Sequence, residues 1–284
     1  MRQLKKAYPK TNIRRLCLLF DVPASSYYHA QQPNTASAKH QYLIDTVKSI
    51  HSDVDKTYGK RRIRAELLAM GIRIGLYKTA SLMKEANVIA SRPRKKHRYA
   101  EHESEHKTVS NVLQQAFNPG TLDTHYVGDI TYLRTYRGFA YLAAVMDLGN
   151  REIVGWAIAH QATAELAQQA LDVALQKYKP DTKNLLFHTD QGCQYTARHF
   201  QDYLTKQGIT PSMSRRGNCL DNAVMERFFR SLKTERLNNI AIVDHGSAKQ
   251  LVEDYIRFYN YRRRHSSIGY IAPVMKRLQM KKTA

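Results

Sequence analysis

The sequence predicts a chain in two parts, an all-helical N-terminal region followed by an α/β domain with a central mixed sheet. Up to about residue 90, apolar side chains recur at helical spacing. In the second half, segments rich in aromatic and β-branched residues alternate with amphipathic helices. Between them, residues 91–107 carry almost no apolar side chains. We therefore expect a helix-turn-helix region at 1–90, a charged linker at 91–122, and an α/β domain with a basic C-terminal tail at 123–284.

Two helix pairs are expected in the N-terminal region. The first lies in TNIRRLCLLFDVPASSYYHA, residues 11–30, where Pro23 suits the first turn of the second helix. A longer helix at 40–54 follows, and the second pair occupies 58–90, where Gly71 ends the first of its helices. A helix, a tight turn and a helix form the outline of a DNA-binding helix-turn-helix. A helical hairpin with a solvated basic face has the same pattern and stays open as an alternative.

The α/β domain is expected to begin with three antiparallel strands, the segments HYVGDITYLRTY, FAYLAAVMD and REIVGWAIA. Turn residues separate these strands at Arg137 and Gly138 and at Gly149 and Asn150. The elements that follow are a helix at 163–178 with Thr163 as its N-cap, a strand at 185–188, a helix at 196–207, a strand at 210–214 and a helix from Asn222 to about Asn239. This order predicts a mixed five-stranded sheet with flanking helices.

The charge of the chain predicts a polyanionic partner. Its 284 residues include 45 Lys and Arg but only 24 Asp and Glu, which gives a formal net charge of +21. Solubility is usually reached with a much smaller imbalance. Nucleic acid is therefore the favoured partner, with a membrane surface or a ribosomal role as the alternatives.

Composition also excludes several protein classes. The three cysteines, Cys17, Cys193 and Cys219, are too far apart to indicate a disulfide framework or a Cys-rich zinc site. No apolar run approaches the roughly 18–20 residues of a membrane-spanning helix, and the N-terminus lacks the apolar core of a signal peptide. We therefore expect a cytoplasmic, nucleoid-associated protein with no membrane partner.

Three acidic residues lie where a metal-dependent reaction would need them. Asp129 lies within the first strand, Asp190 follows the fourth, and Glu226 lies on the helix after the fifth. Three bare carboxylates would repel a phosphodiester, whereas Mg²⁺ prefers such hard oxygen ligands. Two ions about 3.5–4 Å apart can clamp an in-line phosphoryl displacement. The alternative is that each acid only caps a helix or pairs with Arg.

The helix that carries Glu226 has two distinct faces. Its apolar stripe consists of Val224, Phe228 and Leu232, and its polar side of Glu226, Arg230 and Lys233. The basic residues that we expect to contact DNA phosphates are Arg61, Arg62, Arg215, Arg216, Arg230, Lys233, Arg262, Arg263 and Arg264. Tyr195 and Tyr259 either stack on unpaired bases or belong to the core.

The segments around these acids resemble a known protein family. GDITYL around Asp129, HTDQGCQYT around Asp190 and SMSRRGNCLDNAVMERFFRSLKTE around Glu226 resemble the integrase catalytic core of bacterial insertion-sequence transposases. The match is closest to the second-reading-frame product (OrfB) of the IS3 family. The segment YNYRRRHSSIGYIAP resembles the family's tail motif, and YGKRRIRAELLAMGI resembles its upstream helix-turn-helix.

This resemblance implies an RNase H-like core and a DNA transposase that cleaves and joins the ends of an insertion element. It implies an Asp-Asp-Glu triad of Asp129, Asp190 and Glu226 that binds Mg²⁺ or Mn²⁺, with two ions, and a DNA-end contact by Lys233. The implied partners are the terminal inverted repeats, target DNA, further copies of the chain and the first-reading-frame protein (OrfA), as partner or fusion. The departures from the family pattern are Tyr126, Thr189, Cys193 and Leu220.

Other functions fit the residues less well. A tyrosine recombinase would need Arg262, His265 and Tyr270 in one site, but this Tyr is only five residues from the His. A cysteine hydrolase built on Cys193 with His188 or His199 does not fit so basic a chain. The main alternative is a catalytically silent DNA-binding regulator or inhibitor of transposition, against which the intact set of three acids argues.

Overall fold

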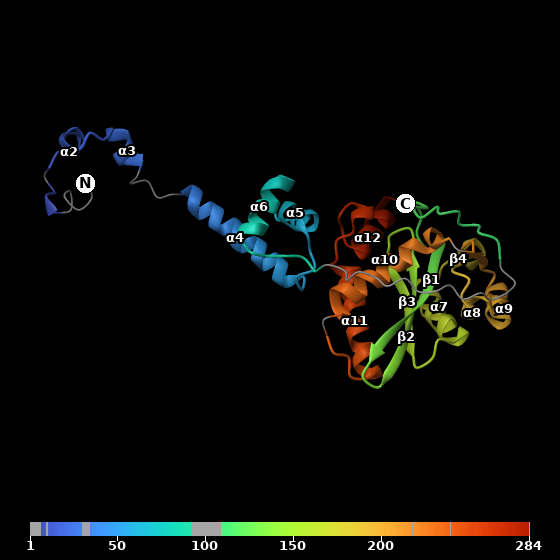
Figure 1. Cartoon of the computed structure of the whole chain (residues 1–284). Helices are drawn as coiled ribbons and strands as arrows, with labels where there is room; N and C mark the ends of the chain where they lie inside the picture. The colour runs from blue at the N-terminus through green and yellow to red at the C-terminus, as the bar shows by residue number, and fades with distance from the viewer. Residues whose placement is uncertain are drawn as a thin grey trace.

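The computed structural model describes residues 7–9, 11–29, 35–91, 109–216, 218–238 and 240–283. Most of the expected charged linker, residues 92–108, therefore lies outside the described residues. The N-terminal helices are α2 (Ile13–Leu19), α3 (Ala24–His29), α4 (Thr35–Asp53), α5 (Lys60–Ala69) and α6 (Leu76–Glu85). Figure 1 shows α2 and α3 at one end, α4 to α6 as a second group, and a sheet with flanking helices beyond them.

The two expected helix pairs both form. In the first, the Asn12 side chain caps α2 by accepting a hydrogen bond from the backbone of Arg14 (2.9 Å). In the second group, α4, α5 and α6 close around Val47, Ile63 and Leu82, each with no exposed surface. No helix in the described part of the chain is long and apolar enough to cross a membrane.

The α/β domain contains the expected mixed five-stranded sheet. Its strands are β1 (His125–Thr135), β2 (Gly138–Asp147), β3 (Ile153–Ala159), β4 (Leu186–Thr189) and β5 (Thr210–Met213). The strand order is β3-β2-β1-β4-β5. The pairs β1–β2 and β2–β3 are antiparallel, whereas β1–β4 and β4–β5 are parallel. This prediction is confirmed because aromatic and β-branched runs separated by turns mark each strand locally.

Helices cover both faces of the sheet. On one face lie α7 (Ala164–Tyr178), α8 (Cys193–Thr196) and α9 (Arg198–Gln207); on the other lie α10 (Ala223–Leu232), a π-helical segment η3 (Lys233–Leu237) and α11 (His245–Tyr261). The remaining elements are the 3₁₀ turns η1 (Thr182–Asn184), η2 (Cys219–Asn222) and η4 (Ser266–Ile268) and the last helix, α12 (Pro273–Thr283). As expected, Thr163 caps α7 by accepting a hydrogen bond from the backbone of Leu166.

Part of the expected linker belongs to the α/β domain. Leu113 is 2% exposed and lies in the core cluster beneath α10 and α11. The hydroxyl of Ser212 on β5 accepts hydrogen bonds from the backbones of Val112 and Leu113 (2.9 and 3.1 Å). This attachment was not visible in the sequence, because a single buried leucine among polar residues has no periodicity.

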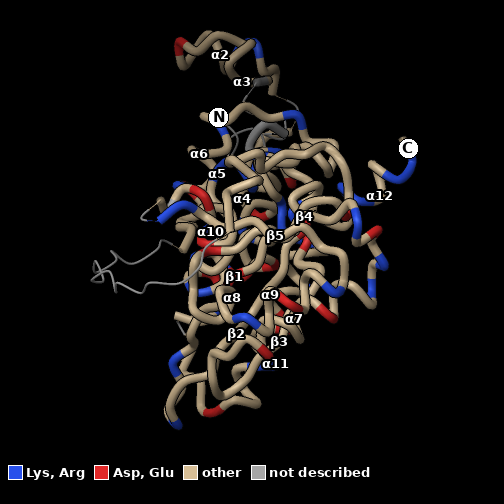
Figure 2. The backbone as a smooth tube through the Cα atoms, turned by 90° about the vertical axis from the view of Figure 1, so that its right-hand side faces the viewer, with Lys and Arg blue, Asp and Glu red and all other residues tan. Residues whose placement is uncertain are grey.

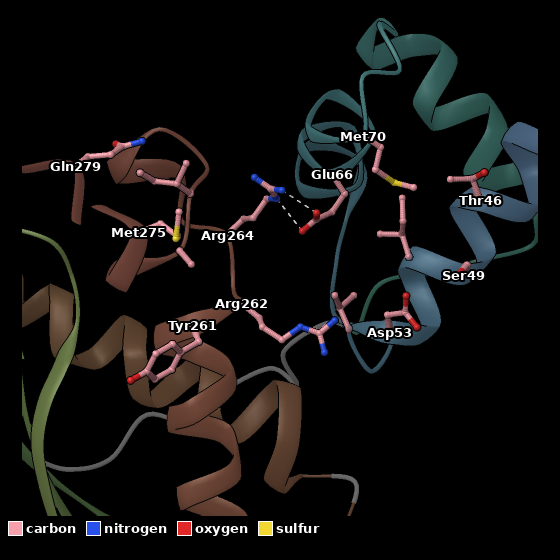
Figure 3. A pocket seen from close by; sticks show the side chains of 14 residues that line it. Thr46, Ser49, Asp53, Glu66, Met70, Tyr261, Arg262, Arg264, Met275 and Gln279 are labelled. Carbon is pink, nitrogen blue, oxygen red and sulfur yellow. Dashed lines mark hydrogen bonds and ion pairs between the residues drawn. The ribbon is translucent and has the colours of Figure 1, made fainter. Parts of the chain in front are cut away.

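The helical group α4–α6 contacts the α/β domain through charged side chains. Arg62 on α5 pairs with Glu235 on η3 (3.2 Å), and Arg264 after α11 pairs with Glu66 on α5 (2.7 Å). Figure 3 shows the second pair beside a cavity of about 450 Å³ between the two parts. The Tyr58 hydroxyl accepts a hydrogen bond from the backbone of Arg264 (2.7 Å). These contacts connect the helix-turn-helix group to the helices that follow the sheet.

Gly155 on β3 permits close packing of α7, and its replacement tests that packing. A Cβ there would lie 2.1 Å from the carbonyl oxygen of Ala170 and 2.8 Å from the nitrogen of Ala174. We expect Gly155→Ala to lower the free energy of unfolding by about 3 kcal/mol, because the helix backbone must move. Urea unfolding measures this, with Gly246→Ala as control, since a Cβ there meets nothing closer than 3.6 Å. Equal unfolding midpoints for Gly155→Ala and the wild type would contradict the packing.

Candidate active site

Asp129 lies on β1, and Asp190 directly follows the end of the adjacent parallel strand β4. The β1–β4 register pairs Val127 with His188, so continuing it by two residues places Asp129 beside Asp190. Residues two apart on a strand share a face. Val127 and Leu186 both belong to the core cluster under α10 and α11. The two aspartates are therefore directed to the face of the sheet that α10 covers.

Glu226 reaches the same region from α10. This helix buries Met225, Phe228 and Leu232 against the sheet, and Glu226 lies in its exposed first turn. As the sequence predicts, the apolar and polar faces of the helix are separate. Lys233 begins the π-helical segment that continues α10, and its Nζ lies 4.5 Å from the ring centroid of Tyr132 on β1.

The electrostatics show that the acids lie near one another. Burial of the carboxyl group, and then the negative charge of Asp190, raise the pKa of Asp129 well above its usual range. The charge of Glu226 raises this pKa further, while Lys233 lowers it. Burial also raises the pKa of Asp190, against a hydrogen bond that its carboxylate accepts from the backbone of Gly192 (3.0 Å). At Asp129, the charges of the other two acids therefore add to the effect of burial.

The donor chemistry fits a hard divalent cation. All three residues offer carboxylate oxygens, the ligands that Mg²⁺ prefers, and a cation would relieve the repulsion that raises the pKa of Asp129. Within the described ranges, no three His, Cys, Asp or Glu side chains already converge closely enough to hold a metal ion. The structure thus shows interacting acids rather than a closed set of ligands.

Tyr195 lies near the two aspartates but belongs to the aromatic cluster on the other face of the sheet. Tyr195 is 2% exposed and packs with Phe187 and Phe200. Burial, and then the charges of Asp129 and Asp190, raise its pKa well above the usual range. Tyr195 therefore belongs to the core. Tyr259 also does, with 1% of its surface exposed, so neither side chain is free to stack on a DNA base.

Asp221 is a supporting residue that the sequence reasoning missed. Its buried carboxylate accepts hydrogen bonds from the backbone and Nε of Arg215 (2.9 and 3.0 Å), from Gln115 and from Asn111. Arg215 is the main cause of its pKa, which lies below the usual range for Asp. These bonds fix the loop that leads into α10. No local signal indicates them, because Gln115 and Asn111 lie more than a hundred residues away in sequence.

The expected phosphate contacts differ in exposure. Arg61, Arg215, Arg216, Arg230 and Arg262 are exposed. Arg62 and Arg264 are half-buried in their pairs with Glu235 and Glu66. Arg263 is only 3% exposed, and its Nε and Nη2 donate to Glu235 (2.7 and 2.6 Å). The guanidinium nitrogens of Arg263 already donate to protein acceptors, so we do not assign Arg263 a phosphate contact.

Basic residues lie on both parts of the chain. Figure 2 shows Lys and Arg on elements throughout the molecule, with Asp and Glu between them.

The His188 ring is buried between the hydroxyls of Ser212 (2.9 Å) and Ser214 (3.2 Å). Burial lowers the pKa of His188. With both ring nitrogens engaged inside the sheet, it is not placed to activate Cys193, which argues against a cysteine hydrolase.

The chain matches known proteins over most of its length. Residues 122–219 and 207–273 match two family models, each described as an integrase core domain, and residues 39–97 match an HTH-like domain. The chain is 35% identical over 261 residues to the 31 kDa protein of insertion element IS600 from Shigella sonnei, covering 91% of this chain and 96% of that protein. It is 32% identical over 275 residues to transposase InsF for insertion sequence IS3A from Escherichia coli (strain K12), covering 95% of each. The chain belongs to the IS3 family of insertion-sequence transposases.

Membership of this family settles the class of the enzyme. The chain is a DNA transposase with an integrase core, a polynucleotidyl transferase of the Asp-Asp-Glu type, and the silent regulator is not favoured. The family also implies use of a divalent metal, binding to DNA and an oligomer on DNA. Among solved structures, the integrase catalytic core of HTLV-2 in complex with magnesium aligns with a TM-score of 0.40 at 16% identity, covering 51% of this chain and 91% of that one.

The departures from the family pattern leave the acids in place. Tyr126 is buried, and its hydroxyl donates to Asp123 (2.8 Å). The Thr189 hydroxyl donates to the backbone oxygen of Asp190 (3.0 Å). Leu220 is 61% exposed. Tyr126 and Leu220 therefore differ in packing and surface character, and Thr189 contacts only the backbone of an acid.

Proposed function

We propose that Asp129, Asp190 and Glu226 are the catalytic acids with which this transposase cleaves and joins element ends. The observation that carries the proposal is that Asp129 on β1 and Asp190, just after the adjacent strand β4, lie on the face of the sheet covered by the helix that bears Glu226. The raised pKa of Asp129, caused by burial and by the other acids, supports a common site. Such a site concentrates negative charge in a chain of net charge +21.

Asp129 and Asp190 would share two Mg²⁺ or Mn²⁺ ions, and Glu226 would complete the ligand set. Two such ions, when bound, favour deprotonation of the attacking hydroxyl and stabilise the leaving oxygen. The carboxylates must be ionised to act as ligands, so their raised pKa values make protons compete with metal binding. Activity is therefore expected to rise as pH increases through these raised pKa values.

The remaining residues position DNA. Arg230 on α10 and Lys233 on η3 both follow Glu226 along the chain, and there their charges meet the phosphates of an element end. In the reaction, water attacks a phosphodiester at the end of the element and frees a 3′-hydroxyl. That hydroxyl attacks another phosphodiester by the same chemistry and displaces a new 3′-oxygen. The DNA partners are the terminal inverted repeats and target DNA, and the protein partners are further copies of the chain and the first-reading-frame protein.

A cleavage and joining reaction on the element's own ends tests this proposal. The purified chain, alone and with the first-reading-frame protein, is incubated with labelled duplex ends in Mg²⁺, Mn²⁺ or EDTA. We expect 3′-hydroxyl ends and joined products with either metal, none with EDTA, and recovery when excess Mg²⁺ is restored. Products formed in EDTA would contradict metal dependence. No product with metal and both proteins present would favour the silent regulator.

A further inference from the structure

A second charged site lies on α10, away from the three acids. A cavity of about 470 Å³ is enclosed by α5, α10, the end of α11 and the segment that follows it. The arginines that line it are Arg62, Arg151, Arg227, Arg230, Arg263 and Arg264. No Asp or Glu of the described chain is among its lining residues, and Glu226 does not line it. The cavity is therefore strongly positive.

The acids near the cavity neutralise only part of this charge. Glu235 pairs with both Arg62 and Arg263, and Glu66 pairs with Arg264. The other three arginines form no ion pair with any acidic side chain of the described chain. Two carboxylates thus balance only part of the charge of the six guanidinium groups, and several positive charges remain for a ligand.

Arg151 has donors that the protein does not use. Its side chain lies before β3 and the residue is 5% exposed. Nη2 donates to Asn118 (2.6 Å), whereas Nε and Nη1 are buried and have no acceptor among the described residues. Unpaired buried donors of a charged group are costly and rare. The backbone of Arg151 also adopts a φ of 66°, a conformation that non-glycine residues seldom hold except under local constraint.

The arginines around the cavity also act on His265, which is one of its lining residues. Its pKa is lowered to about 3 by burial and by the charges of nearby arginines, Arg263 first among them. The neutral ring therefore accepts a hydrogen bond at Nε2 from Arg263 (3.2 Å). Phe117, Phe228 and Tyr259 form apolar walls around this group, and the cavity has room for more than a bare phosphate.

We propose that this cavity is a phosphate-binding pocket that holds a backbone phosphate of a DNA strand, with Arg151 at its base. Guanidinium groups suit phosphate because their paired N–H groups meet two oxygens at once. The pocket shares α10 with Glu226, so a strand held here is placed relative to the catalytic acids through one helix. This inference rests on the proposed function only in that the ligand is DNA.

Binding measurements without divalent metal test the pocket separately from catalysis. The probes are inorganic phosphate, a nucleoside monophosphate and a duplex carrying an element end. The variants are Arg151→Gln and, in case that buried change disturbs folding, the exposed Arg227→Gln. Arg257→Gln is the control, because Arg257 is an exposed residue of α11 that pairs with Glu253.

We expect phosphate to raise the melting temperature of the wild type and the control but not of Arg151→Gln or Arg227→Gln. We expect both pocket variants to bind the duplex about tenfold more weakly, with a slope of log affinity against log salt reduced by about one. Without phosphate, Arg151→Gln should melt no lower than the wild type, since it removes unpaired buried donors. Unchanged binding of all three probes would overturn the pocket. Weaker phosphate or nucleotide binding with unchanged DNA binding would overturn the assignment to DNA.

Discussion

Replacing Asp190 by Asn is expected to abolish cleavage and joining while leaving the protein at least as stable as the wild type. A lost metal ligand removes several kcal/mol of transition-state stabilisation, which corresponds to roughly 10³-fold or more in rate. The fold should gain, because burial and the charge of Asp190 both raise the pKa of Asp129. An uncharged Asn removes that repulsion.

The pH dependence distinguishes this account from simple damage to the fold. The folded-state pKa of Asp190 is raised, so the wild type loses stability as pH rises through that pKa. The stability advantage of Asp190→Asn should therefore grow as pH rises through that pKa when no metal is present. Thermal melting at several pH values measures it, with Asp202→Asn on the exposed face of α9 as the control. A variant that melts well below the wild type at pH 8 would contradict the account.

Divalent metal should stabilise only the proteins that keep Asp190. A ligand that binds only the folded state raises its melting temperature. Mg²⁺ or Mn²⁺ should therefore stabilise the wild type and the Asp202→Asn control but have little effect on Asp190→Asn. An equal metal-induced shift in Asp190→Asn would mean that the ion binds elsewhere.

Replacing Arg277 by Met is expected to cause the largest loss of stability. Arg277 on α12 is 6% exposed and pairs with Asp123 (2.6 Å), Asp147 (2.9 Å) and Glu152 (2.5 Å). Its guanidinium also lies 4.2 Å from the ring centroid of Tyr178. Removing the one cation leaves three enclosed carboxylates unpaired, and breaking a buried pair in this way costs about 3–5 kcal/mol. Chemical unfolding measures the loss.

The loss in Arg277→Met should be greater at pH 8 than at pH 5.5. Burial raises the pKa of Asp147 to about 7, against hydrogen bonds from the backbones of Gly149 and Asp123. Because its pKa is raised, the Asp147 carboxyl keeps a stabilising proton at low pH and loses it as pH rises through about 7. At pH 8, Arg277→Met therefore leaves a charged Asp147 without its cation, whereas at pH 5.5 this carboxyl is largely neutral. Lys281→Met, an exposed change on the same helix, is the control. A loss that is equal at both pH values would contradict the role of this cluster.

Local patterns were enough to predict much of the fold. The three antiparallel strands, the caps of α7 and the two faces of α10 follow from periodicity and turn residues within short windows. Asp129, Asp190 and Glu226 were identifiable because each lies at a strand or helix position that topology brings to one face of the sheet. The nearness of Asp129 to Asp190 depends on the β1–β4 register, which the order of elements constrains.

The supporting contacts were not predictable because they join distant segments. The run Arg262 to Arg264 has the composition of a solvated surface, yet Arg263 is buried against Glu235. Asp221 and Arg277 are likewise explained only by partners far away in sequence. In each case a charged residue is buried because it pairs with a residue distant in sequence, and sequence periodicity does not reveal such pairs.

The most direct test of the central claim is a joining reaction with pre-cleaved element ends and Mg²⁺, measured for single substitutions of the three acids. The variants are Asp129→Asn, Asp190→Asn and Glu226→Gln, with the exposed Asp202→Asn and Glu253→Gln as matched controls. Each acid variant should bind the ends but form no joined product, while both controls join at the wild-type rate. Joining at the wild-type rate by any one of the three acid variants would contradict the assignment of the catalytic site.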